Sequence, residues 1–168
     1  MTRRCYVALG ANLGDPVMTV NAAIAALCGL PDSRVVAASS LYRTAPVGLK
    51  HQPDFINAVV AIDIATAVLP APTFLAQLFA IESEFGRQRT VPNAPRTLDL
   101  DLLLYGDEVS ADPICILPHP RMHQRAFVLA PLAQIAPELL IPGHGAVSEL
   151  LEKCADQAIE RLVPESVA

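Results

Sequence analysis

The residues most able to do chemistry are two aspartates in one of the most apolar stretches of the chain, Arg96-Thr97-Leu98-Asp99-Leu100-Asp101-Leu102-Leu103-Leu104-Tyr105. Side chains alternate between the two faces of a strand, so Asp99 and Asp101 share one face, about 6.6 Å apart at Cα. The leucines at 98, 100, 102 and 104 share the other. Two carboxylates at this separation can hold one or two Mg²⁺ ions, with room for water and a polyphosphate. The pair therefore predicts phosphoryl transfer.

An alternative interpretation is that the aspartate face simply meets solvent, as one face of many antiparallel sheets does. Exposed acidic residues are common, and the pair taken alone favours this alternative. Aspartate is depleted in strands, however, and such conflicts with local propensity concentrate at functional sites.

Basic residues lie on both sides of the aspartates in the sequence, and they are Arg87, Arg89, Arg96, His119, Arg121, His123 and Arg125. Guanidinium groups donate in a planar fork to phosphate oxygens and stabilise charge on a transferring phosphoryl group. A single arginine is more often a solvated surface charge, but this concentration favours a phosphate clamp. The glycine-containing turn 10–14 is a weaker phosphate signal, and a P-loop kinase is excluded because the chain lacks G-x-x-x-x-G-K-[ST].

Asn57 and two phenylalanines are candidates for binding a flat heterocycle. The amide of Asn57 offers a donor and an acceptor, which suits a heterocycle's edge. Phe55 and Phe127 can stack on its faces, although each phenylalanine taken alone is more often a core residue. No serine or cysteine in the sequence resembles an activated nucleophile with an adjacent base, which favours direct transfer between two bound substrates.

Hydrophobic periodicity predicts the elements that position these residues. Strands are expected at 5–9, 35–42, 55–64 and 98–105, helices at 16–27 and 73–85, and further amphipathic segments near 127–135 and 147–162. Asp15 is a candidate cap of the first helix, with Pro16 in its first turn. The order predicts an α+β fold, a ferredoxin-like βαββαβ sandwich with an antiparallel sheet and extra C-terminal helices.

Length and composition narrow the class of protein. The 168 residues predict a single domain over 1–168, with the tail after about 163 frayed. A net charge of −5 argues against nucleic-acid binding, and no apolar run is long enough to cross a membrane. The N-terminal residues lack a signal-peptide pattern, so we expect a cytoplasmic protein. The cysteines are widely separated and indicate neither a zinc site nor a redox motif.

Several segments together resemble the 6-hydroxymethyl-7,8-dihydropterin pyrophosphokinase family, from Tyr6 to about Leu140. The segments are Gly10-Ala11-Asn12-Leu13, Tyr42-Arg43-Thr44-Ala45-Pro46, Gln52-Pro53-Asp54-Phe55-Ile56-Asn57-Ala58, Glu82, Gly86-Arg87-Gln88-Arg89, Pro95-Arg96-Thr97-Leu98-Asp99-Leu100-Asp101 and Pro118-His119-Pro120-Arg121-Met122. The aspartate-strand motif and the Pro-His-Pro-Arg-Met segment are the most specific. The resemblance implies transfer of pyrophosphate from the co-substrate ATP to the hydroxymethyl group of the pterin, releasing AMP, in folate biosynthesis.

The resemblance also implies roles for individual residues and a monomeric enzyme. Asp99 and Asp101 would hold two Mg²⁺ ions and act in catalysis with Arg87 and Arg96. The pterin would be bound by Thr44, Ala45, Val47, Phe55, Asn57 and Phe127, and ATP by Glu82, Arg89, Leu102, His119 and Arg125. The chain departs from some family members at Phe55, in place of tyrosine, at Phe79, in place of a polar nucleotide contact, and in the loop 90–94, which is shorter and lacks tryptophan.

Two other functions remain open at this point. A two-metal nucleotidyltransferase would use the same aspartates and arginines but would release pyrophosphate. A small-molecule-binding module would need neither the aspartates nor Mg²⁺, and the fold alone does not decide because it carries many functions.

Overall fold

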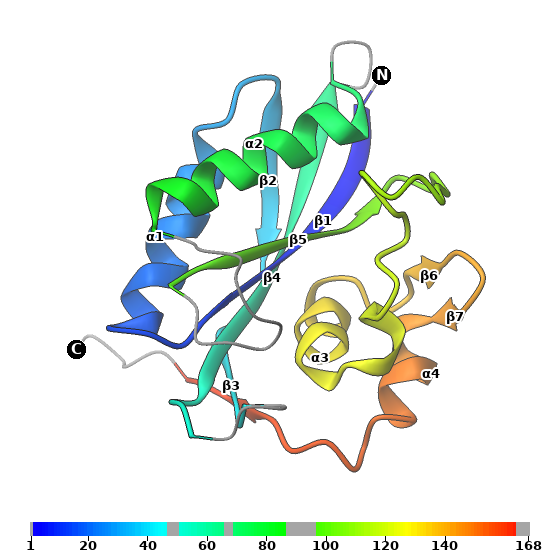
Figure 1. Ribbon diagram of the computed structural model, residues 1–168. Helices are drawn as coiled ribbons and strands as arrows, with labels where there is room; N and C mark the ends of the chain where they lie inside the picture. Colours follow the sequence, from blue (N-terminus) through cyan, green and yellow to red (C-terminus); the bar gives the residue numbers. More distant parts are fainter. Residues whose placement is uncertain (1, 47–50, 66–68, 87–96, 164–168) are drawn as a thin grey trace.

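The computed structural model describes residues 2–46, 51–65, 69–86 and 97–163 (Figure 1). Along the chain the strands and helices are β1 (Thr2–Ala11), α1 (Pro16–Cys28), β2 (Ser33–Ala38), β3 (Tyr42–Thr44), β4 (Phe55–Ala65), α2 (Ala71–Glu84), β5 (Asp99–Tyr105), the 3-10 helix η1 (Met122–Gln124), α3 (Ala126–Ile135), β6 (Leu140–Ile141), β7 (Gly145–Ala146), α4 (Val147–Glu152) and β8 (Glu160–Arg161).

The main sheet has the strand order β5-β1-β4-β3-β8, with β2 also paired to β4, and every pairing is antiparallel. This arrangement confirms the predicted ferredoxin-like fold. The single strand expected at 35–42 is divided into β2 and β3. The division occurs because the Ser39 hydroxyl, rather than a backbone carbonyl, accepts the hydrogen bond from the backbone N–H of Val59 at 3.0 Å.

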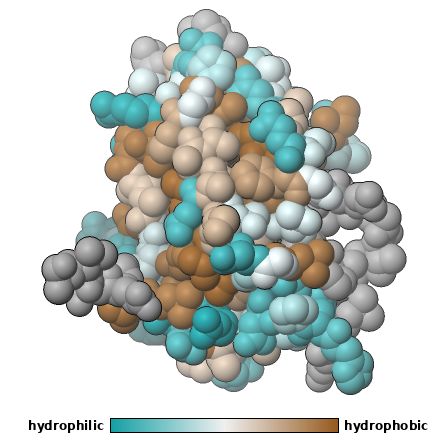
Figure 2. Space-filling view, turned by 90° about the vertical axis from the view of Figure 1, so that its left-hand side faces the viewer, coloured by the Kyte–Doolittle hydropathy of each residue, from teal (hydrophilic) through white to brown (hydrophobic). Residues whose placement is uncertain are grey.

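Helices α1 and α2 cover one face of this sheet (Figure 1). Their buried side chains, such as Leu78 of α2, pack against alternate residues of the strands, such as Val7 of β1 and Leu100 of β5. Asp15 caps α1 as predicted, since its carboxylate accepts from the backbone N–H of Met18 at 3.1 Å. Figure 2 views the molecule from the side of α1, where apolar and polar groups are intermixed on the surface.

Helices α3 and α4 cover part of the opposite face and enclose a second core. The prediction that Leu104 shares a face with the other even-numbered leucines was wrong. The register of β5 against β1 shifts between the pairs Tyr6↔Leu104 and Val7↔Leu102, so Leu103 is an extra residue. A bulge of this kind reverses the alternation, and Leu104 therefore packs in the core beneath α3.

The C-terminal segment differs from the predicted amphipathic stretch at 147–162. Helix α4 ends at Glu152, and the chain then runs through turns into β8, which pairs with β3. The backbone N–H of Leu162 donates to the carbonyl oxygen of Leu41 at 2.8 Å. The end of this segment therefore forms a strand on the β3 edge of the main sheet and is not helical. The tail expected to fray falls almost wholly in 164–168, outside the described residues, and none of the described helices is long and apolar enough to cross a membrane.

Candidate active site

The aspartate strand β5 presents both carboxylates beside the first turn of α3. Asp99 pairs with Gly10 of β1, and Asp101 pairs with Ala8. Both aspartates are partly exposed and line the same cavity. The face of the sheet that was predicted to carry both aspartates is therefore the face on which α3 lies. The cavity is in a part of that face that α3 does not cover.

His119 and Arg125 add polar groups to this end of the site. Nε2 of His119 lies 4.0 Å from a carboxylate oxygen of Asp101. Burial, together with the positive charge of Arg125, lowers the pKa of His119 to about 4, although the negative charge of Asp99 opposes the shift. His119 is therefore neutral at pH 7. The guanidinium of Arg125 lies over the ring of Phe127, 5.3 Å from its centroid.

Asn57 of β4 lies next to Gly10 on the other side of β1, so one row across three strands contains Asn57, Gly10 and Asp99. The Asn57 amide donates to the Thr44 hydroxyl of β3 at 2.9 Å. Gly10 leaves room for this amide, because a Cβ at that position would lie 3.3 Å from Asn57 Oδ1.

These groups surround a cavity of about 490 Å³. It is lined by Ala8, Leu9, Gly10, Thr44, Ala45, Pro46, Phe55, Asn57, Asp99, Asp101, Gln124, Arg125, Ala126, Phe127, Gln157 and Ala158. The two partly exposed phenylalanines, Phe55 and Phe127, provide aromatic surface, and the aspartates provide hard oxygen ligands. The cavity therefore combines a place for a flat ring with a place for charged groups.

The segment before Phe55 is fixed by Asn12, in the turn that was considered for phosphate binding. Asn12 is 1% exposed, and its amide donates to Oε1 of Gln52 at 2.7 Å and to the carbonyl oxygen of Pro53 at 3.0 Å. The turn after β1 thus positions the chain that leads into Phe55.

Other predicted site residues lie elsewhere or outside the described part of the chain. Glu82 is 2% exposed, and its carboxylate accepts from the backbone N–H of Leu100, between the two aspartates, at 2.7 Å. Leu102 packs in the core beneath α1 and α2, and Phe79 is an exposed residue of α2. Outside the described residues are Val47, Arg87, Arg89, Arg96 and the loop 90–94.

Among the residues of the cavity wall that were not predicted from the sequence are Gln124, Gln157 and Ala158. Gln124 is next to Arg125 and could have been found from that proximity. The other two belong to the segment after α4, which carries no motif and was expected to be amphipathic.

Comparison with known proteins identifies relatives over most of the chain. A family model described as 7,8-dihydro-6-hydroxymethylpterin-pyrophosphokinase (HPPK) matches residues 6–137. The 2-amino-4-hydroxy-6-hydroxymethyldihydropteridine pyrophosphokinase of Pseudomonas aeruginosa is 46% identical over 162 residues, which are 96% of this chain and 98% of the relative. The protein of the same name from Haemophilus influenzae is 40% identical over 159 residues, 95% of this chain and 98% of the relative.

Among solved structures, wild-type Plasmodium falciparum HPPK-DHPS with SDX-DHP is similar in fold, with a TM-score of 0.71 at 13% sequence identity. The similarity covers 91% of this chain and 44% of that chain. It supports the ferredoxin-like arrangement of β1 to β5.

Proposed function

Because the chain belongs to the 7,8-dihydro-6-hydroxymethylpterin-pyrophosphokinase family, we propose that ATP donates its pyrophosphoryl group and that Asp99 and Asp101 hold two Mg²⁺ ions during the reaction. The protein transfers pyrophosphate to the hydroxymethyl group of 6-hydroxymethyl-7,8-dihydropterin, in folate biosynthesis. The proposal adds that AMP and the pterin diphosphate are the products. It is carried by one observation, the single cavity that joins the aspartates to Asn57 and the two phenylalanines.

The pterin half of the proposal uses Phe55, Phe127, Asn57 and the segment 44–47. The two rings sandwich the pterin, while the Asn57 amide binds its edge. The hydrogen bond from Asn57 to Thr44 holds the amide plane in one orientation, which favours a flat ligand lying in that plane. Backbone groups of Thr44, Ala45 and Val47 complete the recognition of the ring.

The donor set of the aspartate end fits magnesium. Mg²⁺ binds to proteins through one or two carboxylates and fills its remaining positions with water and substrate phosphates. The described residues bring no group of three His, Cys, Asp or Glu together, so a carboxylate pair is the donor set that they offer. When bound, the ions neutralise charge on the triphosphate.

The remaining polar groups bind and orient ATP. Arg125 contacts phosphate oxygens, and the neutral His119 donates or accepts a hydrogen bond beside Asp101. Arg96 binds the transferring group, Arg87 acts with it, and Arg89 binds ATP. The side chains of Glu82 and Leu102 are buried and do not line the cavity, so they do not contact ATP there. The chain thus contributes position and fixed charge to a direct, in-line transfer without a covalent enzyme intermediate.

The proposal treats residues 1–168 as one catalytic domain that acts as a cytoplasmic monomer, without nucleic-acid or membrane partners. The net charge of −5 supports the absence of a nucleic-acid role, because such binding depends on positive charge.

The test is AMP release from ATP and Mg²⁺, measured with and without 6-hydroxymethyl-7,8-dihydropterin. We expect pterin-dependent AMP and an equal amount of pterin diphosphate. Release of pyrophosphate would instead identify nucleotidyl transfer, and no turnover by folded protein would leave a binding module.

The metal assignment is tested by replacing Asp101 with Asn. Asp101→Asn should lower kcat by about 100-fold or more, because removing the carboxylate weakens the stabilisation of charge in the transition state. The circular dichroism spectrum should be unchanged. Asp107→Asn, in the exposed turn after β5, is the matched control and should retain activity. A wild-type rate for Asp101→Asn at saturating Mg²⁺ would refute the assignment.

A further inference from the structure

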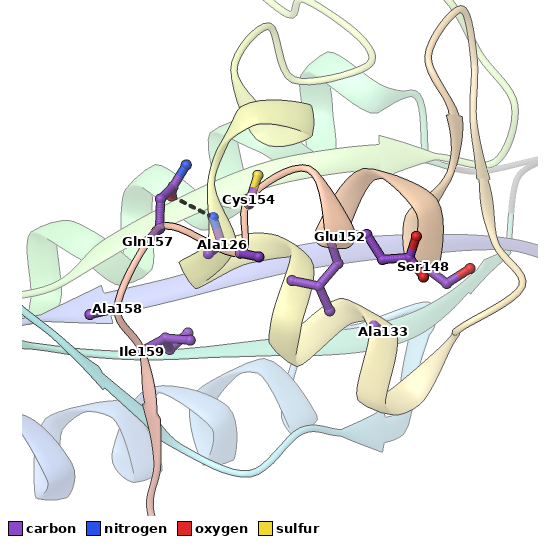
Figure 3. A pocket seen from close by; sticks show the side chains of 10 residues that line it. Ala126, Ala133, Ser148, Glu152, Cys154, Gln157, Ala158 and Ile159 are labelled. Carbon is purple, nitrogen blue, oxygen red and sulfur yellow. Dashed lines mark hydrogen bonds between the residues drawn. The ribbon is translucent and has the colours of Figure 1, made fainter.

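Residues 153–162, here called the crossing segment, connect α4 to the edge of the main sheet and pass over the start of α3. The side chain of Gln157 makes two hydrogen bonds on the way. Its Oε1 accepts from the backbone N–H of Ala126 at 2.9 Å, and its Nε2 donates to the carbonyl oxygen of Gln124 at 2.8 Å. The first of these bonds is drawn in Figure 3.

These two bonds lie on either side of Arg125. The first N–H groups of a helix have no partner within the helix, and the side chain of Arg125, at the N-cap position of α3, makes no capping hydrogen bond to them. Gln157 therefore acts as a distant cap for Ala126, which is 2% exposed. By holding the backbone at both 124 and 126, it fixes the direction in which the first turn of α3 presents Phe127 to the cavity.

The same segment also holds the opposite wall of the cavity. Its strand β8 pairs with β3, with Arg161 opposite Tyr42 and Glu160 opposite Arg43. Thr44, at the end of β3, accepts the hydrogen bond from Asn57. One stretch of chain therefore connects the element that carries Phe127 with the element that orients Asn57, and Gln157 and Ala158 themselves line the cavity.

Packing alone does not hold Gln157 in place. Gln157 is exposed and borders an open groove of about 680 Å³, which is lined mainly by small side chains, among them Ala133, Ser148 and Cys154 (Figure 3). A side chain with open space behind it is held by its hydrogen bonds, because few atoms are available to contact it.

We propose that Gln157 is a positioning residue for pterin binding, which sets the affinity for the pterin by fixing the first turn of α3 over the cavity. The proposal rests on the proposed function, and it concerns a residue beyond the part of the chain, 6–137, that the family model matches.

The test replaces Gln157 with methionine, which keeps the length of the side chain and removes both hydrogen bonds. The Kd for 6-hydroxymethyl-7,8-dihydropterin is measured by calorimetry, in the presence of a non-hydrolysable ATP analogue and Mg²⁺, well below the melting temperature. Gln157→Met should raise this Kd about tenfold, as the loss of positioning hydrogen bonds predicts. Gln157→Glu keeps an acceptor for Ala126 but loses the donor to Gln124, and should give an intermediate Kd.

The matched control is Gln134→Met, at the other end of α3. The Gln134 amide oxygen accepts from the backbone N–H of Ser40 and from the Tyr42 hydroxyl, at 2.9 and 2.8 Å, and it does not line the cavity. Its loss should lower the melting temperature to a similar extent while leaving the pterin Kd unchanged.

An unchanged pterin Kd in folded Gln157→Met would overturn the proposal, as would an equal rise in Kd for both glutamine variants. The wild-type protein separates this failure from a failure of the proposed function. If wild type itself neither bound the pterin nor released AMP, the function would be wrong irrespective of Gln157.

Discussion

At the scale of residues, Gly10 connects the part of the site that contains Asn57 with the part that contains the aspartates. It lies between Asn57 and Asp99 in the row across β4, β1 and β5, so the two side chains are about 10 Å apart at Cα. A methyl group at Gly10 would crowd the Asn57 amide at 3.3 Å. We predict that Gly10→Ala raises the KM for the pterin about tenfold, the size expected from overpacking. Steady-state kinetics at saturating ATP measure this change.

Gly29→Ala is the control for the Gly10 prediction. A Cβ at Gly29 would meet the carbonyl oxygen of Ala26 at an ordinary 3.5 Å, and Gly29 does not line the cavity. Its pterin KM should equal that of wild type. If Gly10→Ala also retained the wild-type KM, the amide would have room to move, and its fixed orientation would not determine recognition.

At the scale of elements, the sequence predicted β1, α1, β4 and α2, because periodicity, Asp15 and the prolines act locally. The features that were missed depend on tertiary contacts. The division of β2 from β3 depends on a hydroxyl that bonds to Val59, and the reversal at Leu104 depends on a register shift against β1. The route of residues 153–162 depends on an open sheet edge, which no local pattern reports.

The pairing of β1 with β4 gives a prediction for pH dependence. Arg4 and Asp63 lie directly opposite each other, and Nε of Arg4 donates to Asp63 Oδ1 at 2.8 Å. This bond lowers the pKa of Asp63 below its ordinary value of 3.8. The stabilisation that the Arg4–Asp63 pair gives the folded protein is therefore complete above pH 3.8 and is lost as the pH falls through the folded-state pKa. The Arg4 side chain is 52% exposed, and solvent screening limits the effect to about 0.5 kcal/mol.

Arg4→Met should therefore lower the free energy of unfolding at pH 7 by this amount, with the difference from wild type narrowing once the pH falls below 3.8. Urea unfolding over a pH series measures it. The control repeats Arg4→Met in an Asp63→Asn background, where the difference should not vary with pH. A difference of the same size at every pH in the wild-type background would show that Arg4 contributes through packing instead.

At the scale of the whole molecule, the site exists because two cores share one sheet. The α1 and α2 layer buries one face, and α3 with α4 covers the other face only in part. Of the residues that the sequence singled out, Asp99, Asn57 and Phe127 line the cavity, whereas Leu102 packs in the core beneath α1 and α2. The sequence did not predict that Gln157 lines the cavity, because this depends on the route of residues 153–162 from α4 past the start of α3 to the main sheet.

A shared sheet predicts that both layers unfold together. Leu78 of α2 and Leu129 of α3 are each 0% exposed, in the two different cores. Leu78→Ala and Leu129→Ala should each lower the free energy of unfolding by about 2 to 5 kcal/mol, through lost transfer energy and the cavity that remains. Because β1, β4 and β5 contribute to both cores, each variant should shift one cooperative transition, followed by calorimetry and far-ultraviolet circular dichroism. Two separate transitions in Leu129→Ala, with the α1 and α2 layer still folded, would mean that the layer bearing Phe127 is an independent unit, and the proposal of one catalytic domain would then fail.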